Sequence, residues 1–177
     1  MGTWNAFYVK APSDSDFLGF LVNRRFPKAR IDPGIPFTGV VFPPEQHQPP
    51  QQDMAELSVR LKTDVIWLSF QSTVDAFEYH HWRAGDLLRS LVYGCYKDER
   101  TWESVAGSPE HWERDVLFDP ERLETAIEIA EDEHEKEEFR RIWREAEIRP
   151  GRMEPSLSAG ACAHRVAALY AFPGWGH

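Results

Sequence analysis

The chain has 177 residues, of which 42% are hydrophobic and 28% are charged, and its formal net charge is −9. This length supports one compact domain, and seven Trp, five Tyr and eleven Phe can build its core without disulfides. The excess of acid argues against nucleic acid or an anionic membrane as the main partner. No apolar run approaches the roughly 18 residues of a membrane span, and the N-terminus lacks a signal-peptide core. Because Cys95 and Cys162 show no metal or redox spacing, we expect a cytoplasmic protein.

The N-terminal third predicts a strand, a helix and a second strand. Residues 5–11 form a short aromatic segment that is typical of a strand. A helix should follow, capped by Ser13 or Asp14 and continuing to about Phe26. Residues 37–42 predict the next strand.

The middle of the chain predicts an exposed loop and then the centre of the sheet. Residues 43–52 contain four prolines among glutamines, so they should form an extended loop. A short helix is expected over 53–62. Residues 64–71 are almost continuously apolar, which indicates a central strand covered on both faces. Residues 75–96 predict a hairpin of two long strands around a short turn.

The C-terminal part predicts edge strands followed by helices. Residues 102–105 and 116–118 are expected to be edge strands. Asp119 is followed by proline and glutamate, which is a strong helix start. A bend or break is expected near the acidic run 131–138, and a last helix over 157–172.

Together these elements predict one α+β domain over residues 1–177. We expect a mostly antiparallel sheet of five or more strands with helices packed on one face. The early strand–helix–strand order is compatible with one parallel pair. The loop 43–52 should be exposed, and the region 119–172 should be helical.

The common catalytic motifs are absent from the sequence. There is no Walker A loop, no G-x-G-x-x-G after a strand, no H-E-x-x-H, no G-x-S-x-G and no C-x-x-C. We therefore expect neither a metal ion nor a cofactor.

The polar side of the hairpin carries the candidate catalytic residues Glu78, His80 and Arg89. Glu78 and His80 share one face of a strand, and a four-residue turn would place Arg89 opposite His80. A three-residue turn would place Leu88 there instead. A carboxylate beside an imidazole suits general-base work, and the three groups could equally hold an anionic ligand. The alternative interpretation is a solvent-facing polar side of the sheet.

The candidate binding residues are Trp82, His111 and Trp112. Several tryptophans cannot be assigned to core stripes, and exposed Trp is typical of protein interfaces and ligand clefts. His111 lies in a loop that could reach the sheet. His81, on the aromatic face of the hairpin, is interpreted as a core histidine with satisfied hydrogen bonds.

The leading functional hypothesis is a non-catalytic protein-interaction module. An inhibitor or immunity-type protein with a basic partner would suit the acidic charge, and a homo-oligomer is a further form of it. The alternative is a small enzyme or small-molecule-binding domain that uses the polar face of the 75–96 hairpin.

Overall fold

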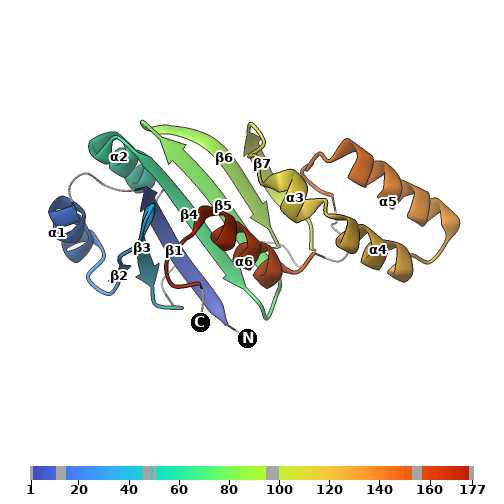
Figure 1. Cartoon of the computed structure of the whole chain (residues 1–177), viewed down its shortest axis with the longest axis horizontal. Coiled ribbons are helices and arrows are strands. Elements are labelled where there is room, and N and C mark those ends of the chain that lie inside the picture. The colour runs from blue at the N-terminus through green and yellow to red at the C-terminus, as the bar shows by residue number, and fades with distance from the viewer. Residues whose placement is uncertain are drawn as a thin grey trace.

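The computed structural model describes residues 2–10, 15–45, 49, 51–94, 100–152 and 157–175. One antiparallel sheet runs through this part of the chain, with the strand order β2-β3-β1-β4-β5-β6-β7 (Figure 1). Its strands are β1 (Thr3–Lys10), β2 (Arg30–Asp32), β3 (Phe37–Phe42), β4 (Asp64–Gln71), β5 (Ala76–Arg83), β6 (Asp86–Tyr93) and β7 (Trp102–Gly107). The predicted α+β fold with an antiparallel sheet is therefore confirmed.

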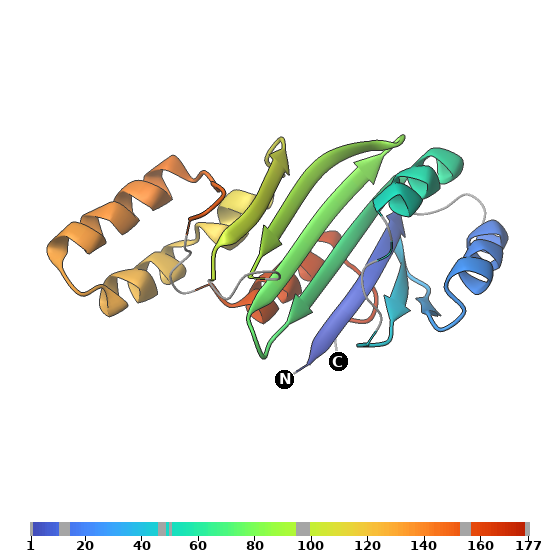
Figure 2. The same cartoon turned by 180° about the vertical axis from the view of Figure 1, so that it is seen from behind.

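Helices cover both faces of the sheet. They are α1 (Ser15–Arg25), α2 (Gln51–Leu61), α3 (Glu113–Leu117), α4 (Pro120–Ile129), α5 (Glu133–Glu145) and α6 (Ala159–Tyr170). α1 and α2 pack on one face, called here the α2 face, and α3 and α6 pack on the opposite α6 face (Figures 1 and 2). The expectation of helices on one face is thus corrected. Strands β1, β4 and β5 bury consecutive side chains, so each of their two faces needs a cover.

The first four strands follow a known arrangement. The order β1-α1-β2-β3-α2-β4, with the sheet order β2-β3-β1-β4, is that of the split β-α-β or ferredoxin-like motif. After α1 the chain enters the edge strand β2 and returns through β3, which pairs with β1 antiparallel. The parallel pair with which the early element order was compatible does not occur among the described strands, because β1 and β2 are not neighbours.

Several predicted elements are confirmed and one is wrong. The strands predicted at 37–42 and 64–71 match β3 and β4, and β4 lies in the middle of the sheet. The hairpin is formed by β5 and β6. The segment 116–118 belongs to α3 and its end, where Val116 packs into the core on the α6 face. Three apolar residues alone do not distinguish a strand from a helix.

Some predicted features lie outside the described residues. These are the capping residues Ser13 and Asp14, Cys95, and residues 46–48 and 50 of the Pro/Gln-rich loop. Of that loop, Glu45 is exposed as expected, whereas Pro49 is buried.

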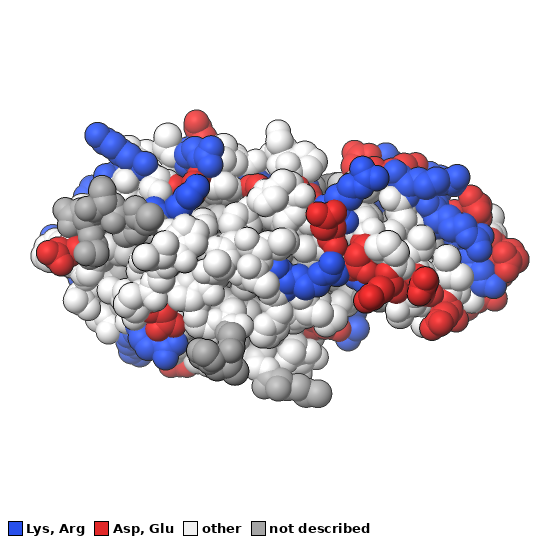
Figure 3. Space-filling view, viewed as in Figure 1, with Lys and Arg blue, Asp and Glu red and all other residues white. Residues whose placement is uncertain are grey.

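Helices α4 and α5 form an arm that projects beyond the β7 end of the sheet (Figures 1 and 2). The predicted break in the acidic run is confirmed, since α4 ends at Ile129 and Asp132 caps α5. The arm packs mainly on itself. Charged side chains gather on it, whereas the surface over α6 is mostly uncharged in the same view (Figure 3). None of the described helices is long and apolar enough to cross a membrane.

Candidate functional site

A β-bulge in the β5–β6 hairpin separates the three predicted catalytic residues. Next to the turn, Trp82 pairs with Leu87, which is the register that a four-residue turn gives. Leu88 is then unpaired, and beyond it Ser90 rather than Arg89 lies opposite His80. Because a shift of one residue turns every later side chain to the other face, Arg89 lies on the α6 face. Glu78 and His80 remain together on the α2 face.

Arg89 has a structural partner on its own side of the sheet. Its Nε and Nη2 donate to the two carboxylate oxygens of Glu113, each at 2.7 Å. Its Nη1 donates to the Gly107 carbonyl at 2.9 Å. Both side chains of the ion pair are almost fully buried. Arg89 therefore ties β6 to α3 and is closed to a ligand.

Glu78 and His80 form a buried polar row. The Trp67 indole donates to Glu78 Oε2 at 3.0 Å, and His80 Nδ1 lies 2.9 Å from the Ser90 hydroxyl. His80 is 1% exposed, and burial lowers its pKa to about 4. The imidazole is therefore neutral at pH 7 and has no open side for a substrate. The interpretation of this face as solvent-facing is wrong, because both residues are buried.

The structure separates the three predicted binding residues as well. Trp82 is buried in the core on the α2 face, and Trp112 is buried in the core on the α6 face. The Trp112 ring meets Tyr79 edge-on at a centroid distance of 5.0 Å. Since core packing uses both indoles, neither offers a surface to a partner. His111 alone is exposed, beside the Tyr170 ring.

A cluster of polar residues surrounds His81 at the edge of an open hollow. Its Nε2 lies 3.0 Å from Asp64 Oδ1, and its Nδ1 lies 2.6 Å from Glu110 Oε1. Both ring nitrogens of His81 therefore lie within hydrogen-bond distance of a carboxylate oxygen. The prediction that His81 has satisfied hydrogen bonds is confirmed.

Both carboxylates around His81 are held ionised. Burial acts to raise the pKa of Asp64, but hydrogen bonds from Arg83 and His81 outweigh it and lower the pKa. Burial likewise acts to raise the pKa of Glu110, but the hydrogen bond and charge of His81 lower it. Each acid is therefore a carboxylate at neutral pH.

The hydrogen bonds continue from both carboxylates. On one side, Arg83 Nε donates to Asp64 Oδ1 at 2.5 Å. On the other, the Tyr170 hydroxyl lies 3.5 Å from Glu110 Oε2 and 3.1 Å from the Tyr79 hydroxyl. Burial raises the pKa of Tyr170 to about 12, so that its hydroxyl stays protonated. A polar chain thus runs from the core to the exposed guanidinium of Arg83.

The hollow has a volume of about 340 Å³. It lies at one end of the sheet, where β1 ends, β4 begins and β5 ends, beside the last turn of α6. Its lining residues are Lys10, Pro36, Phe37, Asp64, Ile66, His81, Arg83, Glu110, His111, Leu169 and Tyr170. The size is within the range of small-molecule sites.

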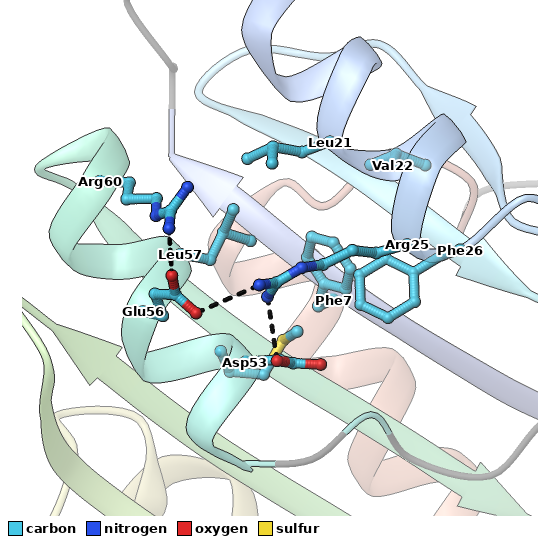
Figure 4. Close-up of a pocket in the computed structure, with 10 residues that line it drawn as sticks. Phe7, Leu21, Val22, Arg25, Phe26, Asp53, Glu56, Leu57 and Arg60 are labelled. Carbon is cyan, nitrogen blue, oxygen red and sulfur yellow. Dashed lines mark hydrogen bonds and ion pairs between the residues drawn. The ribbon is translucent and has the colours of Figure 1, made fainter.

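Two other hollows are less suited to a ligand. Between α1 and α2, Arg25 bonds to Asp53 and Glu56 across a slot of only about 20 Å³, which is room for one water (Figure 4). The groove at the start of α6 measures about 310 Å³, but its Arg165 is paired with Asp119. That cation is therefore already used within the protein.

Among the described residues, no group of three or more His, Cys, Asp or Glu is placed to hold a metal ion. Comparisons with known proteins bring no further assignment. No family model, no curated protein and no solved structure matches this chain.

The site around His81 was not recognised from the sequence, although part of its signal was present. Asp64 pairs with Arg83 across adjacent antiparallel strands, and His81 lies two residues before Arg83 on the same face of the sheet. Glu110 belongs to a loop, and no local pattern indicates which strand it approaches. The bulge at Leu88 left no signal in the sequence either, so Arg89 was expected on the face of Glu78 and His80.

Proposed function

We propose that this protein binds a small anionic molecule in the hollow beside His81. The observation that carries the proposal is that the two carboxylates beside the hollow already have hydrogen-bond partners, whereas several donors beside it lack an acceptor among the described residues. His81 and Arg83 satisfy the Asp64 carboxylate, and His81 and Tyr170 contact Glu110. The groups left over around the hollow are donors and cations.

Three such groups line the hollow. The two Nη groups of Arg83 have no hydrogen-bond partner among the described residues, and its side chain is 59% exposed. Lys10 Nζ is held only loosely, at 3.7 Å from Asp64 Oδ2, and its side chain is 51% exposed. The exposed ring of His111 completes the set. A guanidinium and an ammonium side by side are a common means of binding carboxylates and phosphates.

The proposal is tested by titrating the ¹⁵N-labelled protein with acetate, benzoate and inorganic phosphate. At least one anion should produce saturable NMR shifts in His81, His111 and the last turn of α6. Arg83→Gln should weaken binding about tenfold or more, because a hydrogen bond to a charged group contributes about 1.5–3 kcal/mol.

The matched control is Arg100→Gln. Arg100 is 60% exposed and paired with Asp75, so it resembles Arg83 but does not line the hollow. The control should bind as the parent protein does. Equal weakening by both substitutions, or no saturable shift with any anion, would contradict the proposal.

The α4–α5 arm supports a second candidate function, namely binding of a basic protein. Residues 120–145 contain ten acidic and five basic side chains, more than half of the net charge of the chain. Ile129, near the tip, is 60% exposed. An acidic surface with an exposed apolar side chain would suit a basic partner.

Affinity capture with matched variants tests this second function. A basic protein retained by the parent chain should be lost from a Glu124→Lys/Glu128→Lys variant of α4. It should be retained by Glu45→Lys/Asp86→Lys, which reverses two exposed charges elsewhere. Equal retention by both variants would exclude the arm as the binding surface.

A further inference from the structure

The mouth of the His81 hollow has an apolar rim. Leu169 on α6 and Pro36 before β3 both line the hollow. Leu169 is 56% exposed, and Ile35, which directly precedes Pro36, is 91% exposed. Large apolar side chains with this exposure are few among the described residues; one of them, Leu169, lines the hollow, and a second, Ile35, is the chain neighbour of the lining residue Pro36. Clustered exposed apolar residues beside a polar pocket are typical of ligand sites.

Two cations and two carboxylates line the hollow. Lys10 and Arg83 carry the positive charges, and Asp64 and Glu110 carry the negative charges. A ligand that binds Arg83 and Lys10 therefore lies close to two carboxylates. A monoanion is repelled less by them than a dianion such as a phosphate monoester.

Resting on the proposed function, we propose that the ligand is an amphiphilic monocarboxylate. Its carboxylate binds the two Nη groups of Arg83, with Lys10 and His111 beside them. Its apolar chain lies over Pro36 and Leu169 toward Ile35. The planar edge of a guanidinium matches the two oxygens of a carboxylate, and the rim removes the chain from water.

A series of linear carboxylates tests the apolar rim. Butanoate, hexanoate and octanoate are titrated against the whole protein and followed by NMR, with butylamine, hexylamine and octylamine as the cationic series. Affinity for the carboxylates should rise two- to fourfold for each added methylene, since a fully buried methylene contributes up to about fourfold. The amines should bind at least tenfold more weakly than the carboxylates of equal length.

Substitution of the rim locates the chain. Ile35→Gln/Leu169→Gln should halve the dependence on chain length, or reduce it further, while leaving butanoate affinity within about twofold. Both side chains are largely exposed, so the fold should tolerate the change. Ile129→Gln on α4 is the control, since Ile129 is 60% exposed and does not line the hollow, and it should keep the full chain-length dependence.

The outcomes separate this inference from the proposed function. If phosphate binds and carboxylates do not, or if chain length has no effect, the ligand class is wrong and the anion site remains. If the amines bind as tightly as the carboxylates, or if the rim substitutions leave the chain-length dependence unchanged, the inference also fails. If no anion binds, both proposals fail together.

Discussion

His80 and His81 show how strongly two neighbouring residues can differ. On a strand their side chains point to opposite faces. His81 reaches two carboxylates at the edge of a hollow, whereas His80 is enclosed, with the Ser90 hydroxyl at its Nδ1 and the Trp82 ring beside it. Burial disfavours a positive charge on His80.

The buried state of His80 predicts a pH-dependent stability. Burial lowers its folded-state pKa to about 4, whereas the unfolded chain has the ordinary value of 6.5. Between these values the unfolded state binds the proton and the folded state does not, so stability falls as pH falls. The free energy of unfolding should be about 2 kcal/mol lower at pH 5 than at pH 7 through this group.

Urea denaturation of His80→Gln checks this dependence. The variant should lose most of the change in unfolding free energy between pH 7 and pH 5. His134→Gln, on the exposed arm, should retain it. An unchanged pH dependence in His80→Gln would show that another group is responsible.

At the scale of elements, the β5–β6 turn is held by its backbone and by α2. Ala84 and Gly85 both have positive φ angles, 51° and 92°. The Gly85 N–H donates to the Ser58 hydroxyl at 2.9 Å, so α2 holds the tip of the hairpin. A Cβ on Gly85 would come within 2.9 Å of Val59. Glycine is therefore required at this position, whereas Ala84 occupies a conformation that alanine disfavours.

Replacing Ala84 should consequently stabilise the protein. Ala84→Asn places the residue preferred in such a turn at its first position. It should raise the free energy of unfolding by up to about 1 kcal/mol, or the melting temperature by roughly 2–4 °C. Ala84→Val should lower the melting temperature, because a β-branched residue tolerates positive φ poorly. The melting temperatures of both variants are measured by thermal unfolding. A lower melting temperature for Ala84→Asn than for the parent protein would contradict this account.

At the scale of the whole molecule, the central strands of the sheet and the α4–α5 arm differ in how extensively they pack against other elements. Strands β1, β4 and β5 are covered by helices on both faces. The arm packs mainly on itself and joins the body through contacts such as the edge-on packing of the Trp143 ring against Phe118 at the end of α3, with a centroid distance of 5.9 Å. Local stability follows such contacts, so the two parts should open separately.

Hydrogen exchange should therefore divide the molecule. Amides of α4 and α5 should exchange through local opening, with a lower free energy than amides of β1, β4 and β5. Native-state exchange followed by mass spectrometry measures this difference. Equal protection of the arm and the central strands would show that they unfold as one unit.

Local patterns predicted most of the elements. The apolar run 64–71 is recognisable as a buried strand, and Asp119 with the following proline marks the start of α4. The hairpin and the break before α5 also follow from short segments. Such features depend on residues close together in the chain, and periodicity and capping record them directly.

The functional geometry depends on contacts between distant segments. The bulge at Leu88 sends Arg89 to the face opposite His80, and Glu110 joins His81 from a loop 29 positions away. Neither event leaves a local pattern, because each depends on how packed elements meet. The sequence alone therefore determined which side chains follow one another along each strand. Only the tertiary structure determined on which face of the sheet the hollow opens and which charged groups around it are left without a close partner among the described residues.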